Sequence, residues 1–128
     1  MNQAFEDHFS AHAQDYARYR PCYAPDLFDY LAAISPARRL AWDCGTGNGQ
    51  AAVELARLFE RVVATDASAE QIAAAFPHER IEYRVEQAEQ PSLEAGTVDL
   101  VTVAVAVHWF DFAAFFRQVC RVLRPGGI

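Results

Sequence analysis

The sequence contains no lysine, and its 11 basic residues are arginines scattered among 17 acidic residues. A formal charge of -6 without a basic cluster disfavours a surface that follows the phosphates of a nucleic acid. Cysteine is also scarce, because only Cys22, Cys44 and Cys120 are present. They are odd in number and form no CxxC pair, which argues against a disulfide framework and against a zinc site.

Long apolar runs are missing as well. The longest, residues 98–110, is interrupted by Asp99, Thr102 and His108, and it falls short of the roughly 20 residues that span a bilayer. Residues 1–10 have no basic stretch followed by an apolar one, so they do not resemble a signal peptide. We therefore expect a cytoplasmic protein with no membrane partner.

The composition that remains suits a single globular domain, with 128 residues of which 52% are hydrophobic. Two helical patterns come first. One joins Phe5, Phe9 and Tyr16, and the other runs from Pro25 to a stop at Pro36. We predict that residues 1–36 form a helical lid on the substrate side and that residues 37–128 form a ligand-binding unit.

Beyond Arg39 the pattern changes to alternating strands and helices. Strands are expected at residues 40–43, 62–65, 81–85 and 98–107, and helices at residues 50–59, 68–75 and from 111 onward. Alternation with Glu82 and Arg84 places the third strand at an edge, whereas the valine-rich fourth is typical of a central strand. The sequence predicts an α/β fold with a doubly wound, mostly parallel, Rossmann-like sheet.

A glycine-rich turn, Asp-Cys-Gly-Thr-Gly-Asn-Gly at residues 43–49, joins the first of these strands to a helix. Glycines there permit positive φ angles and a close approach of a ligand to the helix N-terminus. The dinucleotide fingerprint needs a small residue at its sixth position, where this sequence has Gln50. Asp43 would repel a pyrophosphate and attract an ammonium group, so the turn favours a cationic ligand.

Asp66 ends the second strand, 17 residues after Gly49. Acidic residues at about this distance bind ribose hydroxyls, which predicts a ligand that contains a nucleoside. The alternative is that Asp66 only caps the next helix. Ser68 is the better cap, because with Gln71 it forms a capping box.

In this order the segments resemble class I S-adenosylmethionine-dependent methyltransferases, in particular the type 11 subfamily. The resemblance rests on residues 43–49, Thr-Asp-Ala-Ser at 65–68, Ala-Glu at 88–89, Val-Asp-Leu-Val at 98–101, His-Trp-Phe-Asp at 108–111 and Leu-Arg-Pro-Gly-Gly at 123–127. Residues 19–23 are similar to the substrate-side segment of relatives that methylate trans-aconitate and other small molecules. The resemblance implies S-adenosylmethionine as cofactor and a small-molecule methyl acceptor.

The resemblance also implies a cofactor site. Its methionine and ribose parts are Asp43, Gly45, Gly47 and Asp66, and its adenine part is Gln71, Gln87 and Ala88. Further cofactor-side positions are Thr46, Ala67 and Ala104. Tyr16, Tyr19 and Arg20 are candidates for a lid over the cofactor, in which Arg20 pairs with a carboxylate of the ligand or substrate. The alternative is a helix end that packs on the domain. Relatives usually carry Asp where Gln87 stands, and a Gln carbonyl accepts the same bond without charge assistance.

His108 is the candidate general base, because it lies beyond the end of a buried strand, where ligands bind in open α/β sheets. Methyl transfer is an in-line displacement that needs a base only for some acceptors. In the alternative interpretation, His108 and Trp109 only shape the floor of the pocket. His8 and His12 have the spacing of a helical metal pair, but without a third ligand nearby we expect no metal.

Two other function classes stay open at this point: a nicotinamide-dependent oxidoreductase on the same kind of fold, and a cofactor-binding module or fragment without turnover. The family sheet has seven strands in the order 3-2-1-4-5-7-6, and this sequence supplies the first four. We therefore expect a sheet truncated after the fourth strand and its helix, with Ile128 near the start of a fifth. The open edge would pair with another copy or continue in a longer protein.

Overall fold

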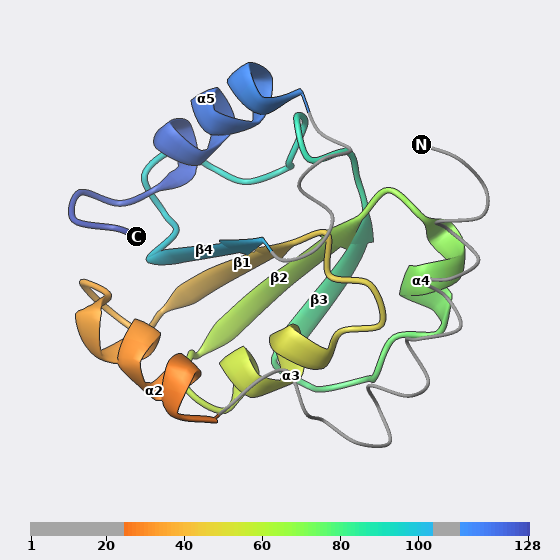
Figure 1. The fold of residues 1–128 in the computed structure, drawn as a ribbon, viewed down its shortest axis with the longest axis horizontal. Coiled ribbons are helices and arrows are strands. Elements are labelled where there is room, and N and C mark those ends of the chain that lie inside the picture. The colour runs from red at the N-terminus through yellow and green to blue at the C-terminus, as the bar shows by residue number, and fades with distance from the viewer. Residues whose placement is uncertain (1–24, 104–110) are drawn as a thin grey trace.

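The computed structural model describes residues 25–103 and 111–128. Its sheet has the order β3-β2-β1-β4, and every neighbouring pair is parallel (Figure 1). The strands are β1 (Leu40–Cys44), β2 (Arg61–Asp66), β3 (Ile81–Val85) and β4 (Leu100–Val103). The helices are α2 (Pro25–Ile34), α3 (Gln50–Ala56), α4 (Ala69–Ala73) and α5 (Phe112–Val122). The predicted Rossmann-like α/β fold is confirmed.

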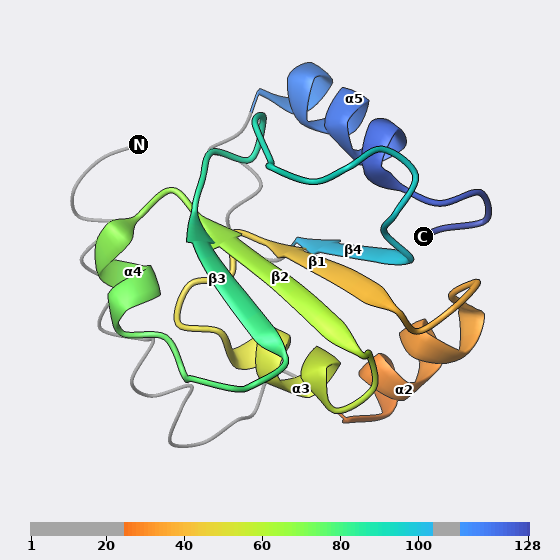
Figure 2. The ribbon, with the colours of Figure 1, turned by 180° about the vertical axis from the view of Figure 1, so that it is seen from behind.

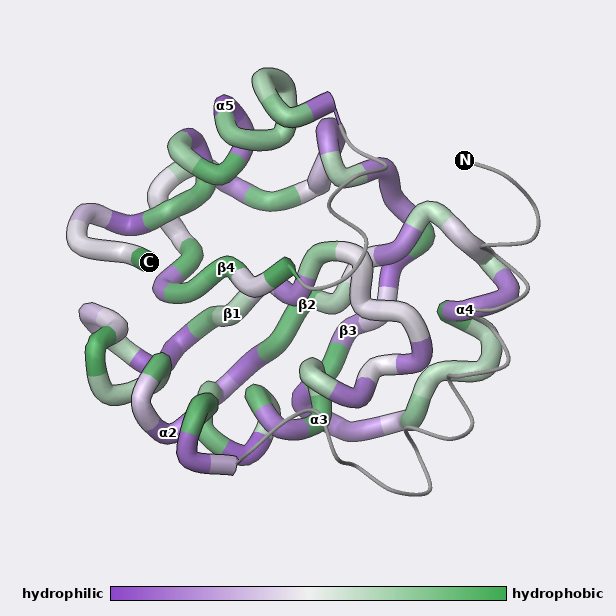
Figure 3. The backbone as a smooth tube through the Cα atoms, viewed as in Figure 1, coloured by the Kyte–Doolittle hydropathy of each residue, from purple (hydrophilic) through white to green (hydrophobic). Residues whose placement is uncertain are grey.

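Helices cover both faces of the sheet, with α2 and α3 on one side and α5 on the other (Figures 1 and 2). Successive side chains of a strand point to opposite faces. Thus Ala41 and Val62 join the core beneath α2 and α3, whereas Trp42 and Val63 join the core beneath α5. The hydropathy of α5 alternates along its turns, as expected for a helix with one buried side (Figure 3).

Trp42 links three elements of the second core. It is fully buried, and its indole Nε1 donates to Thr65 Oγ1 on β2 at 3.0 Å. Its ring meets that of Phe115 on α5 edge to face, with centroids 5.9 Å apart. A buried indole N–H requires an acceptor, so Thr65 allows this large side chain to fill the space between β1 and α5.

The edges of the sheet follow the predictions with one difference. β3 forms one edge, as its alternating pattern predicts. β4 is flanked by Ile128, whose backbone N donates to Asp99 O at 3.1 Å and whose O accepts from Val101 N at 2.8 Å. Residues 101–103 are half-buried rather than buried on both faces, because among the described residues only Ile128 pairs with the outer side of the strand.

The predicted N-cap side chains are present, but the capping box is only half formed, because Ser68 N donates to Asp66 Oδ1 at 2.8 Å and not to the Gln71 side chain. Ser68 Oγ accepts from Gln71 N at 3.2 Å at the start of α4, and Asp111 Oδ1 accepts from Ala114 N at 3.1 Å at the start of α5. α3 ends at Ala56, three residues earlier than predicted, because the chain turns there to bury Phe59. Within the described ranges, no helix is long and apolar enough to cross a membrane.

Candidate functional site

The glycine turn lies at the carboxyl ends of β1 and β2. Gly45, Gly47 and Gly49 have φ angles of 68°, 59° and 89°, in the left-handed region that other residues rarely adopt. Thr46 N donates to Thr65 O at 2.9 Å, which ties the turn to the end of β2. The sequence prediction of a tight turn between a strand and a helix is confirmed.

Asp43 is a buried carboxylate beneath this turn, with 3% of its surface exposed. Its Oδ2 accepts from Thr46 Oγ1 and its Oδ1 accepts from Thr102 Oγ1, both at 2.7 Å. Burial raises the pKa of Asp43 to about 6, the two hydroxyl groups lower it, and the charge of Asp66 raises it further. Among the described residues no arginine forms an ion pair with Asp43, so a cationic ligand would stabilise its ionised form.

Sequence reasoning missed Thr102. Its place beside Asp43 follows from the pairing of β1 with β4, in which the two residues are direct partners. The available signal was a hydroxyl group within an otherwise apolar strand. Only the register of the sheet shows that this hydroxyl faces a carboxylate 59 residues away.

Asp66 lies on the other side of the turn, at the end of β2. Its Oδ2 accepts from Gly47 N at 3.0 Å and its Oδ1 accepts from Ser68 N at 2.8 Å. Both oxygens are therefore oriented by backbone amides, and each retains acceptor capacity for a ligand hydroxyl. Ser68, not Asp66, is the N-cap of α4, which agrees with the preference for Ser68 as the cap.

The remaining predicted residues occupy the same end of the sheet or lie outside the described residues. Ala67 is exposed beside Asp66, and Gln71 is half-buried on α4. Glu86 N donates to Asp66 O at 3.0 Å, which brings the segment after β3 close to Asp66. In that segment Gln87 is exposed, and Ala88 is buried in the core with Trp42. The predictions for Tyr16, Arg20, Ala104 and His108 concern residues outside the described ranges.

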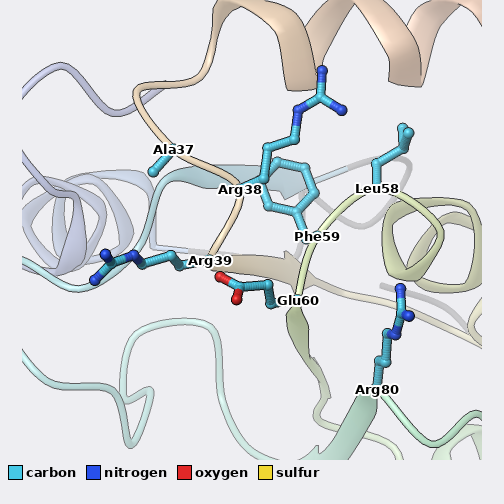
Figure 4. A pocket seen from close by; sticks show the side chains of 7 residues that line it. All are labelled: Ala37, Arg38, Arg39, Leu58, Phe59, Glu60 and Arg80. Carbon is cyan, nitrogen blue, oxygen red and sulfur yellow. The ribbon is translucent and has the colours of Figure 1, made fainter.

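A hollow of about 480 Å³ lies at the opposite end of the sheet, where the strands begin. It is lined by Ala37, Arg38, Arg39, Leu58, Phe59, Glu60 and Arg80. Figure 4 shows that the arginine side chains spread around the hollow and do not meet at one point. In parallel α/β sheets ligands bind at the carboxyl ends of the strands, so the turn between Asp43 and Asp66 is the better candidate site.

The described residues contain no group of three or more metal-ligating side chains. Asp43 and Asp66 flank the glycine turn as a pair of carboxylates on adjacent strands. This arrangement suits a ligand that carries positive charge near one carboxylate and hydroxyl groups near the other.

Comparisons with known proteins identify the family of this chain. The family model described as the methyltransferase domain matches residues 42–128. A Dictyostelium discoideum protein provisionally named a methyltransferase is 39% identical over 124 residues, which cover 96% of this chain and 47% of that protein. The solved structure of a protein from Anaeromyxobacter dehalogenans, provisionally assigned as a type II methyltransferase, has 45% identity and a TM-score of 0.82. The match covers 85% of this chain and 46% of that one.

A third similarity is to an S-adenosylmethionine-dependent methyltransferase from Mesorhizobium loti, with 27% identity and a TM-score of 0.66. The match covers 81% of this chain and 51% of that one. The chain thus spans about half the length of the relatives it matches. All three are named as methyltransferases, which does not favour the oxidoreductase alternative. The chain belongs to the methyltransferase domain family, in its class I, type 11 group.

Proposed function

We propose that this chain is the cofactor-binding part of an S-adenosylmethionine-dependent methyltransferase that acts on a small molecule. The observation that carries the proposal is the pair of carboxylates on either side of the glycine turn. Asp43 is buried without a cationic partner among the described residues, and Asp66 is held by two backbone amides. The relative from Mesorhizobium loti, whose name includes S-adenosylmethionine dependence, supports the same cofactor.

The residues present fit this cofactor by their chemistry. Asp43, whose pKa burial raises to about 6, gains stability as an anion when an ammonium or sulfonium group approaches. Asp66 has acceptor capacity for two ribose hydroxyls. Gly45 is half-buried and Gly47 is buried, and neither has a side chain that would stand between a ligand and the two carboxylates. Gln71, Gln87 and Ala88 are the proposed adenine side, together with Thr46 and Ala67 near the turn.

When bound, S-adenosylmethionine supplies an activated methyl carbon, so the protein's contribution is to position the acceptor and exclude water. For His108 we keep the proposal of a general base, which an acceptor with an acidic proton would need and a carboxylate acceptor would not. Tyr16, Arg20 and Ala104 remain proposed contacts of the cofactor. Because the relatives are about twice as long, we propose that much of the acceptor site lies outside these 128 residues.

Asp43 also argues against a dinucleotide at this turn. A pyrophosphate would face a buried carboxylate, and the like charges would repel each other. Gln50, the first residue of α3, occupies the position where the dinucleotide fingerprint requires a small side chain.

Calorimetric titration of the purified protein with S-adenosylhomocysteine and with NADH tests the proposal. We expect S-adenosylhomocysteine to bind and NADH to show no heat of binding. Tight NADH binding without S-adenosylhomocysteine binding would refute the proposed cofactor. Methyl transfer from a labelled cofactor into a metabolite extract then separates an active enzyme from a binding module.

A further inference from the structure

Tyr83, on the edge strand β3, contacts the glycine turn at Gly49. A Cβ atom added to Gly49 would overlap the Tyr83 hydroxyl oxygen and would lie 3.0 Å from Cζ of the ring. Gly49 is the N-cap of α3, with a φ angle of 89°. The tyrosine therefore occupies the space that any other residue at position 49 would need. The contact joins two strands that are not neighbours, because β2 lies between β3, which carries Tyr83, and β1, which leads into the glycine turn.

The same hydroxyl group makes a second contact. Tyr83 Oη donates to Phe76 O, in the segment after α4. The backbone N of Phe76 in turn donates to Asn48 O in the glycine turn at 2.9 Å. The backbone of Phe76 thus binds both partners: its N–H donates to the glycine turn, and its carbonyl oxygen accepts from Tyr83. We call the contacts among Asn48, Gly49, Phe76 and Tyr83 the Tyr83 latch.

The latch joins the two parts of the candidate cofactor site. The glycine turn carries Gly45 and Gly47 beside Asp43, whereas α4 carries Gln71 on the proposed adenine side. α4 lies beside β3 at the edge of the sheet (Figures 1 and 2), and it has only five residues. A helix this short is not stable by itself, so its position depends on contacts such as those of Phe76.

We propose that Tyr83 is a positioning residue, which fixes the distance between the glycine turn and α4 so that one ligand engages both. This inference rests on the proposed function, because it concerns the same site. Nothing in the family resemblance or in the comparisons gives Tyr83 a role.

The chemistry of the phenol suits this role. Burial raises the pKa of Tyr83 to about 12, and the charge of Asp43 contributes to the rise. The hydroxyl group therefore remains a protonated donor to Phe76 O throughout the usual assay range. The ring packs against the core beneath α3, so replacement by Phe keeps that packing and removes only the hydrogen bond.

The test compares Tyr83→Phe with Tyr30→Phe, which removes a phenol oxygen from an exposed side chain on α2. Binding of S-adenosylhomocysteine, which spans both parts of the site, is measured beside binding of adenosine, which lacks the homocysteine part and would reach only Asp66 and the α4 side. We expect Tyr83→Phe to weaken S-adenosylhomocysteine about fivefold, the effect of one lost hydrogen bond. Adenosine binding should change less than twofold, and Tyr30→Phe should change neither affinity.

A purely structural role predicts a different result. If Tyr83→Phe weakens both ligands in equal proportion, or leaves both unchanged while the wild type binds S-adenosylhomocysteine, the positioning role is wrong. If the wild type binds no S-adenosylhomocysteine, the proposed function fails, and the latch is tested without ligand. In that case hydrogen exchange at the Phe76 amide should be faster in Tyr83→Phe than in Tyr30→Phe, and equal rates would overturn the latch.

Gly49→Ala provides an independent check of the contact. Its destabilisation should be smaller in the Tyr83→Phe background than in the wild type, because the oxygen that a Cβ would overlap is gone. The strain of a positive φ angle is present in both backgrounds and cancels in this double-mutant cycle. Additive effects on the urea midpoint would show that Tyr83 Oη does not constrain position 49.

Discussion

Replacement of Asp43 by asparagine should make the protein more stable and should weaken its binding of S-adenosylhomocysteine, the analogue of the proposed cofactor. Burial raises the pKa of Asp43 from 3.8 to about 6. The folded state therefore binds the proton more tightly than the unfolded state, and ionisation of Asp43 destabilises the fold as the pH rises between these values. This rise in pKa corresponds to a cost of about 3 kcal/mol once the pH is well above 6.

Asparagine retains the shape of the aspartate and carries no charge. Its Oδ1 accepts from one of the hydroxyl groups of Thr46 and Thr102, and its Nδ2 donates to the other. The cost of the buried charge therefore disappears without loss of the local hydrogen bonds. We expect Asp43→Asn to unfold at higher urea concentration at pH 8, with a stability gain that approaches about 3 kcal/mol.

The pH dependence makes this prediction specific. At pH 5 the gain should fall to about half. Asp43 is then mostly protonated in the folded wild type, so the buried charge that asparagine removes is mostly absent. Urea denaturation of both proteins at pH 5 and pH 8 measures it, and the difference between the proteins cancels the other titrating groups. A variant less stable than the wild type at pH 8, or a gain that grows toward pH 5, would refute the reasoning.

The remaining predictions concern the affinity for S-adenosylhomocysteine and the stability of the fold. S-adenosylhomocysteine should bind the wild type more weakly as the pH falls below about 6, because the carboxylate of Asp43 is then protonated. The affinity should fall by at most about tenfold per pH unit. An affinity that calorimetry finds constant from pH 5 to pH 8 would contradict this. Asp66→Ala should cost about 1.5–3 kcal/mol of S-adenosylhomocysteine affinity through lost charged hydrogen bonds, and unchanged affinity would contradict the assignment of Asp66. Asp99 is fully buried, accepts from two backbone amides and lies 3.1 Å from Arg124 Nε. Asp99→Ala should therefore destabilise the fold by about 2–4 kcal/mol, measured by urea denaturation, because the backbone amides of Arg39 and Leu40 lose their acceptor. Arg61→Gln, which breaks an exposed pair with a glutamate, should cost less than about 1 kcal/mol.

Local features of this protein were accessible from the sequence because they depend on neighbouring residues. The period of the apolar residues predicts the strands and helices to within a few positions. The glycines of residues 43–49 predict a turn with φ angles that other residues rarely adopt, and Ser68 predicts the cap of α4. The same reasoning placed α3 three residues too long, because the burial of Phe59 depends on the sheet below it rather than on helical period.

The sequence by itself therefore determined the element types, the edge position of β3 and the acidic residues on either side of the turn. Only the tertiary structure decided the surroundings of those residues. The contact of Asp43 with Thr102 joins positions 59 residues apart, and the contact of Tyr83 with Gly49 crosses β2. Neither has a local pattern, because strand register and the packing of helices on the sheet are set by the whole core. For the same reason, the raised pKa of Asp43 is a property of its burial in the fold and not of the motif that contains it.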